Sequence, residues 1–351
     1  MRVNDDILDL LREKGAEAAR KAQRGVILQP GAIGDCILTL PLAAFMKEIL
    51  GLGGVDILGH SEYIGILPGR TCIDSISSID SIDLHRLFVK TKAFNLIDRD
   101  PLIHAFSAYA WIATFIGGLD SNFEQNLIFT ANCSHSAEII TMSLKPPKSF
   151  SGHLTDFYIQ YFIDHSGLPL QSWQVPHGDC LIKTTEVDIA KGKELLKGMR
   201  FGSGKKLVVI QPGSGGLHKC WHLDNFLAIA KKLISEGIEV IFLLGPAELD
   251  RFSTESIKKI EDIAKYIRDL SLEQVLELLS HANAFIGNDS GITHMAAGLG
   301  VKTLAVFGPT NPAVYKPIGP DVTIFVDDTE IFLKEPSTRL QSELLDVLSA
   351  E

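Results

Sequence analysis

The sequence predicts an α/β protein made of two doubly wound domains, each a mostly parallel sheet with helices on both faces. Short apolar runs of strand length alternate with longer segments of helical periodicity along the chain, and this alternation is typical of βαβ units. The two halves also begin alike, with VILQPG at residues 26–31 and VVIQPG at residues 208–213. The echo indicates that the second half repeats the architecture of the first.

The domain boundary is predicted within residues 167–178, which carry two prolines and little periodicity and are typical of a linker. A chain of 351 residues, 46% of them hydrophobic, can bury a large core, and its length favours two domains. We therefore predict a first domain over residues 1–170 and a second over residues 171–330. Residues 331–351 are predicted to form a tail helix, a candidate to pack back on the first domain.

Composition and charge exclude several classes of protein. A formal net charge of -10 without a long basic block argues against a nucleic-acid groove. The five cysteines are scattered and lack CxxC spacing, so we expect a reducing compartment and no disulfide framework or structural zinc. The N-terminus lacks a signal peptide's apolar core, and no run reaches the roughly 20 apolar residues of a spanning helix. We expect a soluble, cytoplasmic protein.

The first domain is predicted to open with an amphipathic helix over residues 5–24 and then to alternate. Its strands are expected over residues 25–28, 55–58, 73–79, 94–97 and 127–129. Its helices are expected from the loop after the first strand to residue 50, and over residues 62–67, 84–89, 102–116 and 154–165. The pattern predicts a parallel sheet covered on both faces.

The second domain restarts the same alternation. Its strands are expected over residues 207–210, 238–244, 284–286 and 303–307. Its helices are expected over residues 224–236, 249–259, 272–280 and 292–299, followed by the tail helix at residues 330–348. Because ligands bind at the carboxyl ends of the strands in such sheets, the loops after the strands hold the candidate site.

The loop after the first strand, residues 29–35, contains two glycines and leads into a helix, so a ligand can approach its backbone closely. It matches neither the GxGxxG dinucleotide pattern nor the GxxxxGK[ST] phosphate loop. Asp35 lies where the helix dipole keeps a carboxylate ionised, and an ionised carboxylate in a cleft can take a proton from a hydroxyl. Asp35 is therefore a candidate general base, with a capping aspartate as the alternative.

The loop after the strand at 207–210 begins Gly213-Ser214-Gly215-Gly216, which supplies backbone donors, and Lys219 follows within reach. A diphosphate leaving group needs such positive charge, because negative charge grows on it as the glycosidic bond breaks. Glu248, just past the strand at 238–244, is a candidate to accept hydrogen bonds from ribose hydroxyls. The alternatives are a surface lysine and a glutamate at a helix start.

The third candidate loop, Asn288-Asp289-Ser290-Gly291, follows the strand at 284–286 and precedes a helix of small residues. Backbone N–H groups at the helix N-terminus suit phosphate, and the Asp289 carboxylate suits sugar hydroxyls. His294, one turn further, is a candidate to point to the same cleft. A helix cap and a packing histidine are the alternatives.

The motifs occur in a specific order over residues 25–312. They are AIGD at 32–35 with TLP at 39–41, QPG at 211–213 with Lys219 and Trp221, GPAE at 245–248, NDSG at 288–291 with His294, and FGPT at 307–310. The ordered set resembles glycosyltransferase family 9, the ADP-heptose–lipopolysaccharide heptosyltransferases. The resemblance implies a GT-B fold, two Rossmann-like domains facing across a cleft, and inversion at the anomeric carbon without a metal.

Site residues follow from the resemblance by position. Asp35 would be the base on the acceptor hydroxyl, and Lys219 would contact the diphosphate. The residues implied to bind the donor are Gly213, Ser214, Gly215, Lys219, Glu248, Asp289, Ser290, Gly291, Thr293 and His294. Gly34 and Gln29 are implied on the acceptor side, although the family usually has Arg or Lys where this chain has Gln29.

The implied substrates are a nucleotide sugar, ADP-heptose above all, and a lipopolysaccharide inner-core or related lipid-linked glycan. No separate cofactor or metal is expected. The acceptor would be met at the cytoplasmic face of the inner membrane, with peripheral contact there. Two other functions fit the fold: a nucleotide-sugar epimerase, which needs no acceptor, and a non-catalytic nucleotide-sugar-binding module. Acceptor-dependent release of ADP separates the transferase from both.

Overall fold

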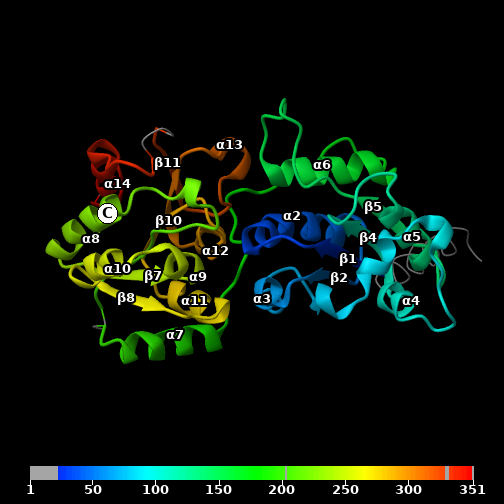
Figure 1. The fold of residues 1–351 in the computed structure, drawn as a ribbon, viewed down its shortest axis with the longest axis horizontal. Coiled ribbons are helices and arrows are strands. Elements are labelled where there is room, and N and C mark those ends of the chain that lie inside the picture. The colour runs from blue at the N-terminus through cyan, green and yellow to red at the C-terminus, as the bar shows by residue number, and fades with distance from the viewer. Residues whose placement is uncertain (1–22, 202–203, 329–331, 350–351) are drawn as a thin grey trace, which may run out of the picture. The chain divides into compact units, whose positions relative to one another are not determined.

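The computed structural model describes residues 23–201, 204–328 and 332–349 (Figure 1). The chain divides into two compact units, one made of residues up to Phe150 with Leu154–Val175 and the other of Ser151–His153 with the residues from Pro176 onward. The chain passes from the first unit to the second at residues 175–176, inside the expected linker. The helix expected over residues 5–24 lies outside the described residues except at its end, where Arg24 begins a strand.

The first unit contains a five-stranded, wholly parallel sheet in the order β3-β2-β1-β4-β5. The strands are β1 (Arg24–Gln29), β2 (Gly54–Gly59), β3 (Ser75–Ser78), β4 (Tyr109–Thr114) and β5 (Glu138–Thr141). The chain starts in the middle, moves out to β3 and returns to the other side of β1. The strand order therefore reverses between β1 and β4, where open α/β sheets bind ligands.

Helices cover both faces of this sheet, as the alternation predicted. They are α2 (Ile33–Ile49), α3 (Ser61–Ile64), η1 (Ile79–Ser81), η2 (Leu84–Phe88), η3 (Thr91–Ala93), α4 (Pro101–Phe106), α5 (Asn122–Ala131) and α6 (Leu154–Ser166). Val26 and Leu28 point to the face buried under η2, α4 and α5. On the opposite face α2 packs against α6, with the Phe45 and Phe162 rings 5.9 Å apart.

Three expectations for the first unit were wrong. Residues 102–116 form α4 followed by β4, because strand β4 pairs with β1 and β5 and is apolar on both faces, a pattern that periodicity cannot distinguish from a helix. Residues 127–129 lie inside α5, whose N-cap Ser121 accepts a hydrogen bond from the Glu124 N–H. Residues 94–97 form no strand. Strand β5 was not expected.

The second unit contains a six-stranded parallel sheet in the order β11-β10-β9-β6-β7-β8. The strands are β6 (Leu207–Gln211), β7 (Glu239–Leu244), β8 (Lys265–Arg268), β9 (Ala284–Asn288), β10 (Lys302–Phe307) and β11 (Val322–Val326). The order reverses between β6 and β9, so the loops that follow these two strands flank the switch point. Strands β8 and β11 were not expected.

The helices of the second unit are α7 (Glu186–Gly198), η4 (Leu217–Lys219), α8 (Leu223–Ser235), α9 (Pro246–Arg251), α10 (Thr254–Glu261), α11 (Leu272–Leu279), α12 (Gly291–Gly298), α13 (Pro312–Tyr315) and α14 (Thr338–Ser349). Helices α8, α10 and α14 share one core with the sheet, and α7 packs on α11 on the other side (Figure 1). The expected helix over 249–259 is two helices, α9 and α10. The tail helix α14 buries Leu340 and Leu344 in this core, so it packs on the second unit, whereas the sequence made it a candidate to pack on the first domain.

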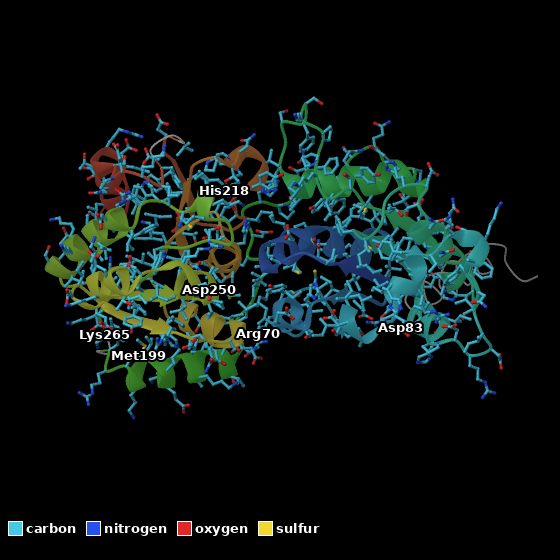
Figure 2. The ribbon with its side chains drawn as sticks, in the orientation of Figure 1. Arg70, Asp83, Met199, His218, Asp250 and Lys265 are labelled. Atoms are coloured by element: carbon cyan, nitrogen blue, oxygen red, sulfur yellow. The ribbon has the colours of Figure 1, made fainter. Side chains whose placement is uncertain are left out.

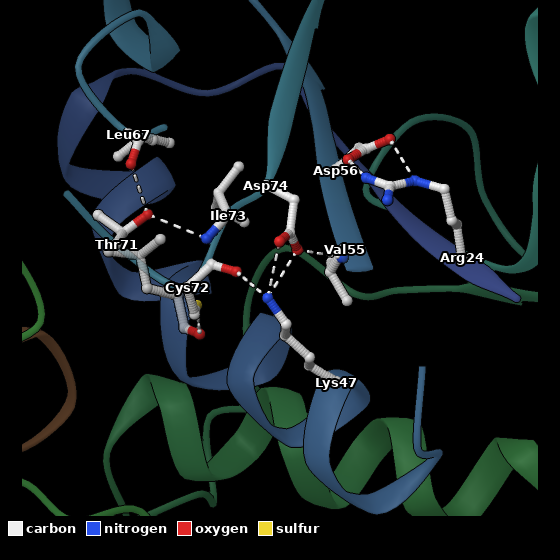
Figure 3. A network of polar contacts seen from close by, with 10 residues as sticks. Arg24, Lys47, Val55, Asp56, Leu67, Thr71, Cys72, Ile73 and Asp74 are labelled. Atoms are coloured by element: carbon white, nitrogen blue, oxygen red, sulfur yellow. Dashed lines mark hydrogen bonds and ion pairs between the residues drawn. The ribbon is translucent and has the colours of Figure 1, made fainter. Parts of the chain in front are cut away.

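A polar network braces the first unit at the amino-terminal ends of its strands (Figure 3). Arg24 pairs with Asp56, and Lys47 donates to both carboxylate oxygens of Asp74 at 2.8 Å. Asp74 also accepts the N–H of Val55 at 2.8 Å, and these partners outweigh its burial and lower its pKa. The network lies at the amino-terminal ends of the strands, opposite the loops that hold the candidate site, so we assign it a structural role.

The described part of the chain contains no helix that is both long and apolar enough to cross a membrane. All five cysteines are free thiols: Cys36 and Cys220 are buried, and Cys133 and Cys180 are exposed.

Candidate active site

Asp35 lies in the first turn of α2, directly after the loop that follows β1. Its Oδ2 accepts the N–H of Ala32 at 3.0 Å and caps the helix. The carboxylate packs against Gly31, where a Cβ atom would lie 2.6 Å from Oδ2, so that position requires glycine. Asp35 is half-buried, as is Gly34, and Asp35 Oδ1 accepts no hydrogen bond from a described residue. The cap therefore uses one carboxylate oxygen and leaves the other for a ligand.

Gln29 orders this loop from inside the unit. Its side chain is fully buried, its Nε2 donates to Thr39 Oγ1 at 2.9 Å, and its Oε1 accepts the N–H of Gly31 at 2.9 Å. Both ends of the amide are thus used within the chain. The side chain therefore points into the unit and positions Gly31.

In the second unit, the loops after β6 and β9 are tied together across the switch point. Asn288 Nδ2 donates to the carbonyls of Pro212 and Gly213 at 2.8 and 3.2 Å, and its Oδ1 accepts the N–H of Trp221 at 2.9 Å. The Ser214 hydroxyl donates to the carbonyl of Asp289 at 2.6 Å. These bonds fix the two loops as one rigid surface at the carboxyl ends of the strands.

Lys219 and Asp289 meet on this surface. The Lys219 ammonium, on η4 beside the exposed His218 (Figure 2), lies 2.7 Å from Asp289 Oδ2. His294, on the first turns of α12, places Nε2 3.8 Å from Asp289 Oδ1. Lys219, 70 positions before Asp289, and His294, 5 positions after it, thus flank one carboxylate. The two ring nitrogens of His294 differ, since Nδ1 is buried and has no hydrogen-bond partner among the described residues.

The electrostatics of this group keep Asp289 ionised. Burial acts to raise the pKa of Asp289, but His294 and Lys219 outweigh it and lower the pKa to about 2. At neutral pH, Asp289 is therefore a carboxylate. Among the described His, Cys, Asp and Glu side chains, no group of three or more could hold a metal ion.

The turn into α12 is closed by its own side chains. The Ser290 hydroxyl donates to Gln211 Oε1 at 2.9 Å and accepts the N–H of Thr293, and the Thr293 hydroxyl donates to the carbonyl of Asn288. Ser290 and Thr293 are buried, and their hydroxyls take part in the hydrogen bonds that shape the turn. The backbone N–H groups of Gly291 and Ile292 donate to no described acceptor and remain for an anion.

Glu248 is buried in the third position of α9. Its Oε2 accepts the N–H of Gly245 at 2.8 Å, while Oε1 lies against Gly213 with no hydrogen-bond partner among the described residues. Burial raises the pKa of Glu248 above its usual range. Only 1% of the residue is exposed, so it caps α9 and lines a cavity of about 200 Å³ beside Cys220 and Trp221.

Two residues of the site were missed by the sequence analysis. Asn288 was placed in the third candidate loop without a role of its own, although an asparagine at the end of a buried strand can bond the neighbouring loop. Arg251, the last residue of α9, donates to the carbonyls of Ser214 and Gly215 at 2.7 and 2.6 Å. No motif marks Arg251, because its role depends on the packing of α9 against the loop after β6.

Two doubly wound units, each a parallel sheet with helices on both faces, are the architecture of the GT-B fold. The fold is shared by solved structures: E. coli ADP-heptose lipopolysaccharide heptosyltransferase II aligns with a TM-score of 0.66 at 16% identity, over 93% of this chain and 98% of that chain. A glycosyl transferase family 9 protein from Veillonella parvula aligns with a TM-score of 0.64 at 18% identity, over 88% of this chain and 86% of that one.

Sequence relatives identify the family. Residues 166–340 match the model of glycosyltransferase family 9 (heptosyltransferase). An E. coli lipopolysaccharide heptosyltransferase 3 is 28% identical over 81% of this chain and 83% of its own length. A Campylobacter coli lipopolysaccharide heptosyltransferase 1 is 29% identical over 81% of this chain and 83% of its own length. The chain belongs to glycosyltransferase family 9 and is a glycosyltransferase, as the motifs indicated.

Proposed function

We propose that this protein transfers a heptose from ADP-heptose to a hydroxyl of a lipopolysaccharide inner-core or related lipid-linked acceptor. The observation that carries the proposal is the Lys219–Asp289 ion pair on the loops flanking the switch point of the second unit. Heptosyltransferases among the relatives support the sugar class. The transfer inverts the anomeric carbon and uses neither a metal nor a separate cofactor.

The donor contacts follow from groups that the fold leaves available. A lysine ammonium has three N–H donors, and Lys219 uses one on Asp289, which leaves two for the diphosphate. The free N–H groups of Gly291 and Ile292 add donors at a helix N-terminus. Asp289, held ionised, accepts hydrogen bonds from sugar hydroxyls. Positive charge is thereby concentrated where the leaving group gains negative charge.

The reaction is a single displacement. The acceptor oxygen forms a bond to the anomeric carbon from the face opposite the diphosphate, and the bond from that carbon to the diphosphate oxygen breaks. The bonding electron pair leaves with ADP. The acceptor proton passes to the Asp35 carboxylate, whose Oδ1 is free of hydrogen bonds from described residues. Because one nucleophile attacks once, the anomeric configuration inverts.

The test is an assay with purified protein, ADP-heptose and a truncated lipopolysaccharide inner core as the acceptor. The readouts are ADP release and the anomeric configuration of the product. We expect ADP release only with acceptor, an inverted linkage, and no loss of activity in EDTA. Epimerised donor without acceptor would replace the proposal with an epimerase. Saturable donor binding without ADP release, across a panel of acceptors, would leave a binding module.

The acceptor is proposed to be met at a membrane surface. Large apolar side chains on the first unit, Phe88, Ile97 and Phe129, are more than half exposed. Sedimentation with anionic vesicles that carry the acceptor tests this contact, and protein that stays in the supernatant would contradict it.

A further inference from the structure

The turn Gly213–Gly216 has donors bound to every one of its carbonyl groups. The Gly213 carbonyl accepts from Asn288 Nδ2, and the Gly216 carbonyl accepts the N–H of Lys219 at 3.0 Å. Between them, Arg251 Nη1 donates to the Ser214 carbonyl at 2.7 Å and Arg251 Nη2 to the Gly215 carbonyl at 2.6 Å. One guanidinium thus holds two consecutive peptide groups.

The N–H groups of the same peptide planes are free. Within the described residues, the N–H groups of Gly215 and Gly216 donate to no acceptor. A peptide bond is planar, and the described chain has no cis bond, so each N–H points opposite to the C=O of its own plane. With the Ser214 and Gly215 carbonyls on Arg251, the N–H groups of Gly215 and Gly216 point away from it. Apart from Gly215 and its two chain neighbours, no described residue has an atom within 4 Å of the position that a Cβ on Gly215 would take, so the turn is open there.

We propose that Arg251 is a positioning residue for the diphosphate of the donor. It fixes the two glycine N–H groups in one direction, where both can donate to phosphate oxygens. The inference rests on the proposed function for the identity of the ligand, a nucleoside diphosphate, and the geometry supplies the role. Arg251 itself touches the loop and not the ligand.

Arginine suits this task because of its shape. Its planar guanidinium presents two parallel N–H donors that match two neighbouring carbonyls, whereas a lysine ammonium is a point donor for one. The cation also polarises both peptide groups, which strengthens their N–H groups as donors. Arg251 is the last residue of α9, and Glu248 caps the first turn of that helix. Helix α9 follows β7, which lies beside β6 in the sheet, so the Arg251 side chain reaches the loop after β6 from the neighbouring strand.

The test compares Arg251→Ala and Arg251→Lys with Arg339→Ala, an exposed arginine of the same unit that pairs with the carboxylates of Asp327 and Glu343 and with no loop carbonyl. Calorimetry with inorganic diphosphate and with ADP measures binding, and urea unfolding measures stability. We expect Arg251→Ala to weaken both ligands about tenfold or more, with Arg251→Lys intermediate and Arg339→Ala unchanged. The urea midpoint of all three variants should stay within experimental error of wild type, because Arg251 is exposed.

The outcomes separate the inference from the proposed function. Unchanged affinity in Arg251→Ala, or a loss of affinity matched by a lower urea midpoint, overturns the positioning role. Wild-type protein that binds neither diphosphate nor ADP overturns both. Wild-type protein that binds both ligands, loses them in Arg251→Ala, yet transfers no heptose retains the positioning role and removes the transfer reaction.

Discussion

At the scale of single residues, the candidate site is defined by which polar side chains have their hydrogen bonds satisfied within the chain and which keep donors or acceptors for a ligand. Gln29, Ser290, Thr293 and Glu248 are buried and bonded to the loops, so they order the backbone. Lys219 retains unused donors, and Asp289 is held as a carboxylate by its neighbours. The residues that bind and those that build the loop cannot be told apart from their types.

Asp35 is tested by Asp35→Asn. An amide oxygen can still accept the N–H of Ala32, so the helix cap survives while the base is lost. We expect turnover to fall by about two orders of magnitude or more with donor affinity unchanged, measured by ADP release and by calorimetry. Asp83→Asn, an exposed aspartate of the same unit (Figure 2), is the control and should keep wild-type turnover. Near-normal turnover in Asp35→Asn removes the base assignment.

Lys219 is tested by Lys219→Met, which keeps the length of the side chain and removes its charge. Because the ammonium meets the diphosphate as it gains charge, kcat/KM should fall about a hundredfold, and ADP should bind more weakly. Lys231→Met, an exposed lysine of α8, is the matched control. Kinetics equal to wild type in Lys219→Met would place the diphosphate elsewhere.

Asp289 predicts a dependence of stability on pH. Its pKa, about 2 in the folded protein, lies below the usual 3.9 or so of an unfolded aspartate. A lowered pKa stabilises the fold above about pH 4 by about 2 kcal/mol, and this is lost as the pH falls toward 2, about half of it by pH 3. Urea unfolding of wild type and Asp289→Asn at pH 6 and pH 3 measures it. If the difference in unfolding free energy between wild type and Asp289→Asn is no smaller at pH 3 than at pH 6, the lowered pKa of Asp289 is contradicted.

At the scale of elements, an ion pair between Arg86 and the buried Asp100 holds a part of the first unit that carries no motif. Asp100, fully buried at the N-cap of α4, accepts two bonds of 2.8 Å from Arg86 and the N–H groups of Leu102 and Ile97. The Arg86 guanidinium, chiefly, lowers the pKa of Asp100 to about 2. The pair ties η2 to α4 over one face of the first sheet.

Asp100→Asn should destabilise the first unit by about 2–3 kcal/mol, since Asn can keep the cap but leaves Arg86 without its charge partner. The value is below that of a wholly buried pair because Arg86 is partly exposed. Urea unfolding at pH 7 measures it, with Asp80→Asn, an exposed aspartate near His60, expected within about 0.5 kcal/mol of wild type. Equal effects of the two substitutions would argue that the Arg86 pair is not stabilising.

At the scale of the whole molecule, the two units use one device twice. The first strand of each sheet, β1 or β6, ends at a glutamine that is followed by Pro-Gly. In each unit a carboxylate packs against that glycine, Asp35 on Gly31 and Glu248 on Gly213. The first carboxylate comes from the helix that follows its own strand, and the second from the helix after the next strand. The repeated QPG motif therefore predicted two similar loops, but it could not indicate that one carboxylate remains half-exposed while the other is buried.

The sequence by itself determined the βα alternation and the two-unit organisation, because the spacing of apolar residues is a local property of each segment. It also indicated the family, because the glycine-containing motifs occur in a fixed order along the chain. It also placed Lys219 and Asp289 among the candidates. Only the tertiary structure decided that β4 is a strand, that α14 belongs to the second unit, and that Arg251 clamps the loop. Each of these findings depends on contacts between segments far apart in the chain. Such contacts do not change the spacing of apolar residues within either segment, so the sequence pattern does not show them.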